Sequence, residues 1–320
     1  MAASLSNFSA SGTTARKEAD RPEFIAGLVD GHTCGAPVTA CIRNTNTRSS
    51  DYEVLRRVPR PGHADYTGHV RYGGYEDWRG GGHFSGRLTA PLVFAGALCR
   101  QYLAEQGVRI GAHIEALGGL TDRRFTPEDA GVFSALREMR LPVLTPGLDR
   151  DMAAAIREVK ARGDSVGGVV ECMTVGLPVG LGAPFFDSVE SQLAHLLFSI
   201  PAVKGVEFGD GFGFGQLTGS EANDALRMRE GKVTSLTNHS GGINGGITNG
   251  MPLIFRLCIR ATPTIHLKQQ TVSLQRMADA EIEAAGRHDP CILPRAVPVV
   301  EAAAAIVLLD LWKERAQNRP

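Results

Sequence analysis

The sequence lacks the features that mark a membrane, secreted or zinc-binding protein. Its longest unbroken apolar run, Ala302 to Leu309, is far too short to cross a bilayer, and no charged segment followed by an apolar one opens the chain. The six cysteines form no CxxC pair, which disfavours a disulfide scaffold and a structural zinc site and is typical of reduced thiols. We therefore expect a cytoplasmic protein with no membrane span.

The chain also has no excess charge of either sign. Lys plus Arg and Asp plus Glu each number 34, so the formal net charge is zero. No global field then draws the molecule to nucleic acid or to a lipid surface, and we expect neither as a partner. Any anion that the protein binds must instead be met by a local cluster of cations.

Several catalytic motifs are missing too. The sequence contains no GxGxxG that opens a helix and no Walker lysine, and its one GxSxG match, at residues 163–167, leads into a predicted strand and is therefore no nucleophile elbow. These absences disfavour a dinucleotide-binding fold, a serine hydrolase and a nucleotide-phosphate transferase. The last of these stays only as a weak alternative that would use the glycine-rich loops.

What is present is a mixture of helix and strand patterns, which indicates an α/β or α+β protein. With 43% hydrophobic and 21% charged residues, the chain is long enough to bury a large core. We expect a single domain over residues 1–320. Proline, glycine and capping residues predict helices over 91–106, 126–139, 149–161, from Asp187 as N-cap, and 298–317. Short β-branched runs predict strands over 24–29, 38–42, 166–175, 203–208, 253–260 and 266–274.

Three stretches carry groups suited to chemistry. Residues 58–90 contain three His, four Arg and eight Gly, and Arg60 and Arg87 are able to clamp a phosphate or carboxylate. The alternative is a solvated loop. A metal held by His63, His69 and His83 is disfavoured because no ligand spacing or acidic cluster accompanies them.

The second and third stretches are equally open to two interpretations. The repeated glycine pairs of 238–252 suit either an anion-binding backbone or a tight structural crossing. In 286–298, Asp289 follows Arg287 and His288 and is either an ion-paired strut or a carboxylate tuned for proton transfer. Other histidines, including His32 and His113, are expected to be ordinary. Together the three stretches suit a polyanionic small molecule beside a flat cofactor.

Long segments of the chain resemble the chorismate synthase family, in order, from about Thr13 to the C-terminus. They are RNTNTRSSDYE, RPGHADYT, RGGGHFSGRLTA, GDSVGGVVE, GLPVGLGAPFFD, IPAVKGVEFGDGF, NHSGGINGGITNGMP, GRHDPCILPRAVPVVEA and the final LLDLW. The resemblance implies an α+β fold, a β-α-β sandwich of two antiparallel sheets surrounded by helices, assembled as a homotetramer.

The resemblance also implies an activity, a cofactor and a set of site residues. The reaction is the anti-1,4-elimination of phosphate from 5-enolpyruvylshikimate 3-phosphate to give chorismate, with reduced FMN required and NADPH a candidate flavin reductant. His63 and Asp289 match catalytic residues of the family, and substrate would be bound by Arg60, Arg87 and Arg287. Flavin contacts would come from His83, Phe84, Ser85, Pro201, Ala202, Gly245, Arg260, Ala261, Thr262, Pro263, Thr264 and Arg287.

Two departures from the family pattern leave a second functional interpretation open. His83 stands where many members have arginine. The family's N-terminal GESHG motif, whose histidine is the other catalytic one, and its RRxPG segment are not recognised, and His32 does not replace the former. We expect a shortened reading of a longer gene. The alternative is a non-catalytic family member that binds flavin or anions.

Overall fold

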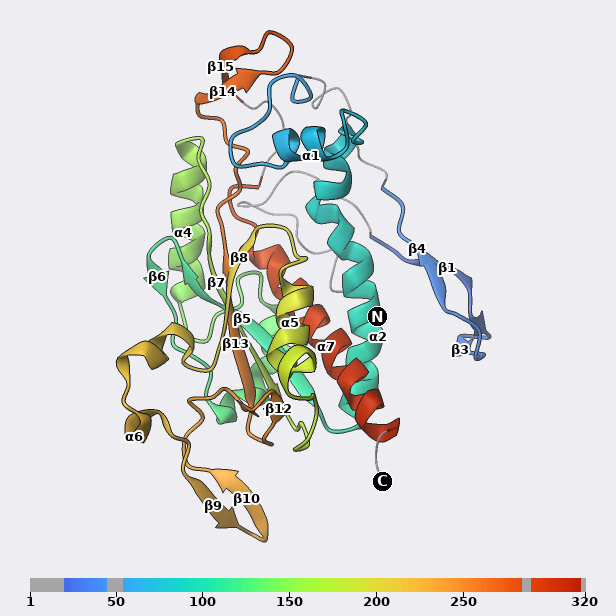
Figure 1. Ribbon diagram of the computed structural model, residues 1–320, viewed down its shortest axis with the longest axis vertical. Helices are drawn as coiled ribbons and strands as arrows, with labels where there is room; N and C mark the ends of the chain where they lie inside the picture. Colours follow the sequence, from blue (N-terminus) through green and yellow to red (C-terminus); the bar gives the residue numbers. More distant parts are fainter. Residues whose placement is uncertain (1–19, 45–53, 284–288, 318–320) are drawn as a thin grey trace. The chain divides into compact units, whose positions relative to one another are not determined.

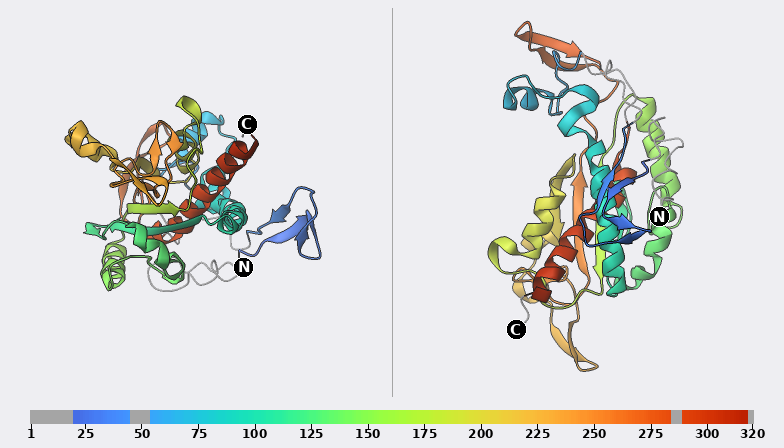
Figure 2. Two further views of the ribbon diagram at one scale, coloured as in Figure 1. Left: turned by 90° about the horizontal axis from the view of Figure 1, so that it is seen from below. Right: turned by 90° about the vertical axis from the view of Figure 1, so that its right-hand side faces the viewer.

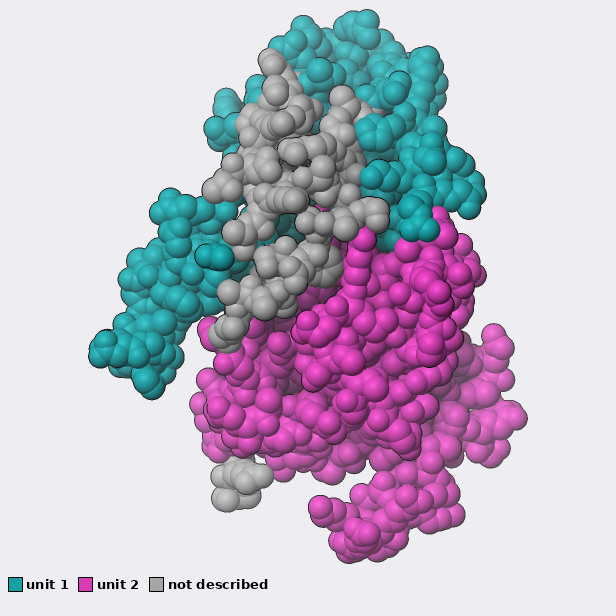
Figure 3. All heavy atoms as spheres, turned by 180° about the vertical axis from the view of Figure 1, so that it is seen from behind, with its two compact units in different colours: residues 1–94, 156–165, 262–291 teal, residues 95–155, 166–261, 292–320 magenta. Residues whose placement is uncertain are grey.

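The computed structural model describes residues 20–44, 54–283 and 289–317, which fall into two compact units (Figure 3). Unit 1 comprises Met1–Phe94, Ile156–Ser165 and Thr262–Cys291, and unit 2 comprises Ala95–Ala155, Val166–Ala261 and Ile292–Pro320. Each unit is described by itself below. That residues 1–320 form a single domain stays a prediction.

Unit 2 is built on a five-stranded antiparallel sheet with strand order β6-β5-β7-β13-β8. Its strands are β5 (Arg109–Leu117), β6 (Leu120–Thr121), β7 (Gly168–Val175), β8 (Val203–Phe208) and β13 (Leu253–Ile259). The long helix α7 (Leu293–Gln317) and the shorter α5 (Val189–Leu197) pack against one face of this sheet (Figures 1 and 2). Mixed helices and antiparallel strands confirm the predicted α+β class.

Alternation along the strands separates an apolar face from a more polar one. In β13, Leu253, Phe255, Leu257 and Ile259 are all buried, whereas the residues between them are half-buried or exposed. Successive side chains of a strand point to opposite faces. The four buried residues therefore form the part of the core that β13 contributes.

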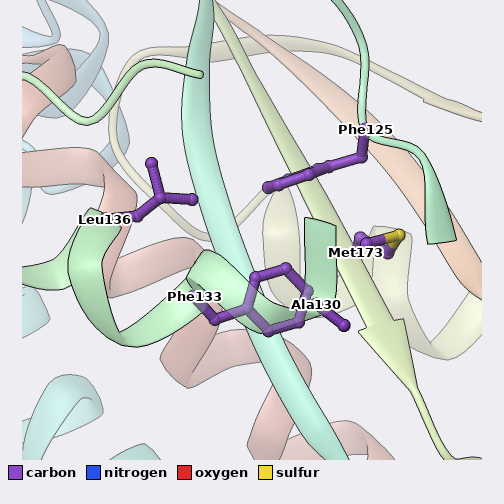
Figure 4. Close-up of a cluster of buried hydrophobic side chains, with 5 residues drawn as sticks. All are labelled: Phe125, Ala130, Phe133, Leu136 and Met173. Atoms are coloured by element: carbon purple, nitrogen blue, oxygen red, sulfur yellow. The ribbon is translucent and has the colours of Figure 1, made fainter. Parts of the chain in front are cut away.

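A second group of buried side chains packs on the other side of β5. It consists of Phe125, Ala130, Phe133, Leu136 and Met173 (Figure 4). A Cβ on Gly111 of β5 would lie 2.1 Å from the Phe133 ring, so glycine there lets the ring approach the strand. The sheet of unit 2 is thus packed on both faces.

The face of the sheet that carries Gly111 and Met173 also carries a row of charged side chains in register across four strands. His113 of β5 pairs with Glu171 of β7, Glu171 with Arg256 of β13, and Arg256 with Glu207 of β8. Charge alternates along the row, which makes each cross-strand neighbour favourable. Arg256 Nη1 also lies 2.9 Å from Glu115 Oε1, so the guanidinium is shared by several carboxylates.

The remaining elements of unit 2 are short. They are the 3₁₀ segments η4 (Pro127–Val132), η5 (Phe185–Asp187) and η6 (Gly211–Gln216), the helices α3 (Phe133–Glu138) and α6 (Gly219–Ala222), and the strands β9 (Leu226–Arg229), β10 (Lys232–Ser235), β11 (Ile243–Asn244) and β12 (Ile247–Thr248). Helices α2 (Thr89–Glu105) and α4 (Leu148–Ala161) have residues in both units.

Unit 1 has little regular structure beyond two-stranded ribbons and one short helix. Its ribbons pair β1 (Glu23–Ala26) with β4 (Thr39–Cys41), β2 (Leu28–Val29) with β3 (His32–Thr33), and β14 (Gln269–Ser273) with β15 (Ala278–Ile282). Helix α1 (Asp65–Arg71) is followed by the 3₁₀ segments η2 (Arg79–Phe84) and η3 (Gly86–Leu88). Loops therefore hold most of the residues predicted to act in chemistry.

Three sequence predictions of helix boundaries need correction. The N-cap of α5 is Ser188, not Asp187, because the Ser188 hydroxyl accepts the Ser191 N–H at 3.0 Å. The last helix begins at Leu293, and Pro298 lies inside it. Proline removes only one hydrogen bond near the start of this helix, where buried Ala296 and Val300 pack into the core. The helix predicted over 126–139 is divided into η4 and α3.

Helices α2 and α7 approach each other closely at a glycine in unit 2. A Cβ on Gly96 of α2 would lie 2.4 Å from Ala302 Cα in α7. Added volume at such a contact forces backbone shifts that cost about 1–3 kcal/mol. Gly96→Ala is therefore expected to lower the free energy of unfolding by about 1–2 kcal/mol in urea titrations, because the clash outweighs alanine's higher helix propensity.

Gly131 supplies a matched control for that change. It is exposed in η4, and a Cβ there meets nothing within 4 Å. Gly131→Ala should change the free energy of unfolding by no more than about 0.5 kcal/mol. Equal stability of the two variants would show that α2 and α7 do not meet at Gly96.

In the part of the chain that the structure describes, no helix has both the length and the apolar character to cross a membrane.

Candidate active site

The RPGHAD segment of unit 1 brings a guanidinium, an imidazole and a carboxylate into direct contact. Arg60 donates from Nε to Asp65 Oδ2 and from Nη2 to Asp65 Oδ1, each at 2.8 Å. His63 Nδ1 lies 2.7 Å from Asp65 Oδ1. Asp65 is the first residue of α1, where a carboxylate is also favoured by the helix dipole.

This cluster is largely shielded from water. The side chains of Arg60 and Asp65 are 6% and 14% exposed, and that of His63 is 18% exposed. Burial alone would raise the pKa of Asp65, but hydrogen bonds from Arg60 and His63 hold it well below its usual range. Asp65 is therefore an ionised carboxylate at neutral pH.

Thr262 and Thr264 connect this cluster to Asp289. Arg60 Nη1 donates to Thr264 Oγ1 at 3.0 Å, and Thr262 Oγ1 donates to the backbone oxygen of Asp289 at 2.8 Å. Two residues of extended chain span at most about 7 Å. The structure thus brings Asp289 near the arginine that also touches His63, although 226 positions separate His63 from Asp289 in the sequence.

A small aromatic group lies in the same unit, around η2. The Tyr72 ring centroid is 5.4 Å from that of His83 and 6.5 Å from that of Phe84. Phe84 also packs on α1, because a Cβ on Gly68 would lie 2.6 Å from the Phe84 ring. His83 and Phe84 are therefore attached to the helix that begins at Asp65.

Of the other two arginines predicted to bind substrate, Arg87 lies in the described part of the chain. Arg87 is one-fifth exposed, and its Nη2 donates to Asp20 Oδ1 at 2.5 Å. Ser85 Oγ accepts the Arg87 N–H at 3.3 Å, so Ser85 and Arg87 form one turn. Arg287 lies outside the described residues.

In unit 2, two of the predicted flavin segments meet at one end of the sheet. The Arg260 N–H donates to the Ala202 oxygen at 3.0 Å, which joins the turn before β8 to the end of β13. Ala202 has φ +75°, a conformation unusual for a residue with a side chain. Strained backbone of this kind clusters at functional sites. Pro201 precedes this turn, and Ala261 accepts a hydrogen bond from Arg260 Nε.

Gly245 is placed differently from its neighbours in the glycine-rich stretch 238–252. At Gly241, Gly242 and Gly246 an added Cβ would lie within 2.8 Å of backbone, which is the structural crossing weighed as an alternative. Gly245 is exposed, and a Cβ there would meet nothing within 4 Å. It lies between β11 and β12, beside the end of β13 remote from Arg260, so unit 2 does not bring Gly245 and Ala202 together.

One residue of this cluster was missed by sequence reasoning. Asp65 touches both Arg60 and His63, yet it was not among the predicted site residues. Its place two positions after His63 in RPGHAD was the available signal.

A hollow of about 330 Å³ in unit 1 is lined by other residues, namely Arg56, Arg57, His69, Trp78, Leu274 and Gln275.

Comparison with known proteins identifies the family. The sequence pattern of chorismate synthase matches residues 4–312. The chain belongs to the chorismate synthase family. Chorismate synthases are lyases, and the family implies a reduced flavin cofactor and a small-molecule substrate. The match begins before Thr13, the position from which the sequence motifs resemble the family.

Individual chorismate synthases are similar to this chain over most of their length. That of Dehalococcoides mccartyi is 46% identical over 299 residues, which cover 93% of this chain and 82% of the relative. That of Thermococcus gammatolerans is 45% identical over 300 residues, with the same two coverages. A crystal structure of chorismate synthase superposes with a TM-score of 0.70 at 28% identity, covering 92% of this chain and 77% of that one. The fold predicted from the resemblance is thereby confirmed.

Proposed function

We propose that this chain catalyses the anti-1,4-elimination of phosphate from 5-enolpyruvylshikimate 3-phosphate to give chorismate, with reduced FMN as cofactor. The observation that carries the proposal is the Thr262–Thr264 segment, which contacts Arg60 at one end and Asp289 at the other. It joins the main chain of Asp289 to the buried Arg60 guanidinium, which also touches the His63 imidazole. Elimination of a phosphate needs those groups to hold an anion and to move a proton.

Arg60, Arg87 and Arg287 are proposed to hold the carboxylates and phosphate of the substrate. Asp65 fixes the plane of the Arg60 guanidinium through two hydrogen bonds, and Asp20 accepts one hydrogen bond from Arg87 Nη2. A guanidinium already held in one orientation loses little further freedom when it binds an anion. The pairing of each arginine thus prepares it for substrate.

The residues around the cluster fit a reduced flavin with an anionic tail. The Arg60 guanidinium supplies positive charge, the His63 imidazole supplies a second polar group, and Tyr72 with Phe84 supplies aromatic surface. A bound reduced flavin supplies electron density that helps phosphate to leave. The proposed contacts are His83, Phe84, Ser85, Thr262, Pro263, Thr264 and Arg287, and the resemblance adds Pro201, Ala202, Arg260 and Ala261. Gly245, which lies apart from Ala202, is not proposed as a contact of the same flavin.

His63 and Asp289 are proposed to carry the proton chemistry. His63 presents an imidazole with one nitrogen held by Asp65 and a ring that is partly exposed, so its Nε2 is the atom suited to hold a proton near the cofactor. Asp289 is proposed to accept a proton through its carboxylate, while Thr262 holds its main chain in place. NADPH is proposed as a flavin reductant, and a cytoplasmic homotetramer as the working form.

An anaerobic elimination assay tests the proposal. Protein supplied with chemically reduced FMN and 5-enolpyruvylshikimate 3-phosphate should release many phosphates per flavin with no net flavin oxidation. Flavin binding without phosphate release, not restored by an added N-terminal GESHG segment, would instead support a non-catalytic flavin-binding protein. Failure to bind flavin even with substrate present would contradict the site assignment.

His63→Gln is expected to lower the elimination rate by about 10²- to 10⁴-fold, because glutamine keeps a polar side chain but transfers no proton. Stopped-flow measurement of phosphate release gives the rate, and circular dichroism checks the fold. His32→Gln is the matched control, since His32 is an exposed histidine of β3 whose ring contacts the backbone oxygen of Asp30. An unchanged rate in His63→Gln would remove His63 from the chemistry.

A further inference from the structure

Asp65 occupies a position from which it controls both His63 and Arg60. Its Oδ2 accepts the backbone N–H and the Nε–H of Arg60, at 3.0 and 2.8 Å. Its Oδ1 accepts Arg60 Nη2–H at 2.8 Å and lies 2.7 Å from His63 Nδ1. Both carboxylate oxygens are therefore used within the cluster.

These contacts decide which nitrogen of His63 carries the proton. An ionised carboxylate only accepts hydrogen bonds, so a 2.7 Å contact with Nδ1 requires a proton on Nδ1. Arg60 Nη2 also lies 3.1 Å from Nδ1, but a guanidinium only donates. The shorter contact with a charged acceptor prevails, and Arg60 Nη2 and His63 Nδ1 then share Asp65 Oδ1 as two donors.

We propose that Asp65 is a positioning residue that fixes His63 as the Nδ1–H form and turns its Nε2 toward the reacting groups. The inference rests on the proposed function for its catalytic consequence, but the protonation of His63 is a property of the free protein. In its neutral form, an imidazole with Nδ1 protonated offers Nε2 as a base, and in its charged form it offers Nε2–H as an acid. Serine proteases orient their histidine through a buried carboxylate by the same logic.

Arg60 strengthens this arrangement from the other side. The Nε–H and Nη2–H of Arg60 hold the Asp65 carboxylate in one plane, and Thr264 Oγ1 accepts a hydrogen bond from Arg60 Nη1. The carboxylate therefore cannot rotate away from His63 without breaking charge-assisted hydrogen bonds inside a shielded cluster. Arg60 orients Asp65, and Asp65 orients His63.

The effect of an amide at residue 65 follows from the same contacts. If the amide nitrogen of Asp65→Asn took the Oδ2 position, it would face the backbone N–H and Nε–H of Arg60, which never accept. At the Oδ1 position it faces one Arg60 N–H and His63 Nδ1, which accepts once its proton has moved to Nε2. Asp65→Asn should thus adopt the second orientation and reverse the tautomer of His63.

Nuclear magnetic resonance of imidazole ¹⁵N nuclei tests the tautomer directly and needs no activity. The chain has nine histidines, and His63→Gln identifies the His63 signals by their loss. The unaltered protein at a pH where His63 is neutral should show Nδ1 protonated, and Asp65→Asn should show Nε2 protonated. A neutral His63 with the proton on Nε2 in the unaltered protein overturns the proposal, whether or not Asp65→Asn folds.

Kinetics then test the consequence for catalysis. Asp65→Asn should lower kcat by about 10²- to 10⁴-fold, because the wrong tautomer is present at the site. Asp65→Glu, which keeps the carboxylate, should recover part of that loss. Asp279→Asn, an exposed change on β15, is the control that should leave kcat and KM unchanged.

Each outcome of the kinetics has a distinct meaning. A reversed tautomer together with a lowered kcat supports the proposal. A raised KM with unchanged kcat overturns it, because Asp65 would then act on substrate binding through Arg60 alone. If the unaltered protein lacks elimination activity although its His63 carries the proton on Nδ1, the proposed function fails and the positioning of His63 stands.

Discussion

Asp289→Asn is expected to lower the rate of phosphate elimination by about 10²- to 10⁴-fold while reduced FMN and substrate still bind. An amide of the same shape cannot take up a proton as a carboxylate does. The contact that holds this segment, from Thr262 Oγ1, is made to the main-chain oxygen of Asp289 and survives the substitution. The loss should therefore appear in kcat and not in the fold.

Single-turnover phosphate release measures the chemical step, and absorbance titration with FMN in the presence of substrate measures binding. Asp279→Asn again serves as the control for a lost exposed carboxylate in the same unit. A variant at 289 that turns over at the normal rate would show that Asp289 is only a strut. That was the alternative left open by the sequence Arg287-His288-Asp289.

The second large effect is expected on stability, at the buried end of the charged row. His113 is completely buried between two carboxylates, with Nε2 2.9 Å from Glu171 Oε2 and Nδ1 3.3 Å from Asp122 Oδ2. Burial acts to lower the pKa of His113, but the Asp122 and Glu171 carboxylates beside its two ring nitrogens raise it above the ordinary value. The buried imidazole is thus stabilised in its charged form.

His113→Gln is expected to lower the free energy of unfolding by about 3–5 kcal/mol at neutral pH, the usual cost of removing one member of a buried ion pair. The lost hydrogen bond matters most for Glu171, which keeps the N–H of Phe125 as a donor. Asp122 keeps two donors, the N–H and the hydroxyl of Thr145. Urea titration followed by circular dichroism measures the loss. His32→Gln, on an exposed ribbon, should change stability by less than about 0.5 kcal/mol.

The raised pKa of His113 also predicts how the free energy of unfolding changes with pH. A histidine with a raised pKa contributes stability that is full below its unfolded pKa of about 6.5 and is lost as pH rises through the folded value. Asp122 has a lowered pKa, since hydrogen bonds from His113, Thr145 and Leu144 outweigh its burial. Its contribution is present above about pH 4 and is lost as pH falls. His113→Gln should abolish the alkaline loss of stability, and an unchanged alkaline slope would contradict this account.

Much of the sheet was predictable from the sequence, and the exception is instructive. The strands β7, β8 and β13 are rich in β-branched and apolar residues, and their predicted ranges agree with the structure within two residues. The strand β5, which pairs with β7, was missed, because Gly111, His113 and Glu115 interrupt its apolar pattern. Those residues suit a strand only when Phe133 covers the glycine and carboxylates of other segments meet the histidine. Local sequence contains neither partner.

The site divides in the same way. The motif of residues 58–65 names the groups, but it does not say that Asp65 bonds Arg60 and His63 together, since three charged residues so close in sequence can pair in several ways. The approach of Asp289 depends on two threonine hydroxyls from a third segment. Only the folded chain provides these contacts.

A double-mutant cycle on His63 and Asp289 tests most directly whether the two residues serve one reaction. Groups that act as a unit in catalysis give losses that are far from additive. Combining His63→Gln with Asp289→Asn should lower kcat little further than the more damaging single change does. Losses that multiply in full, as they do for two independent positions, would contradict a shared site.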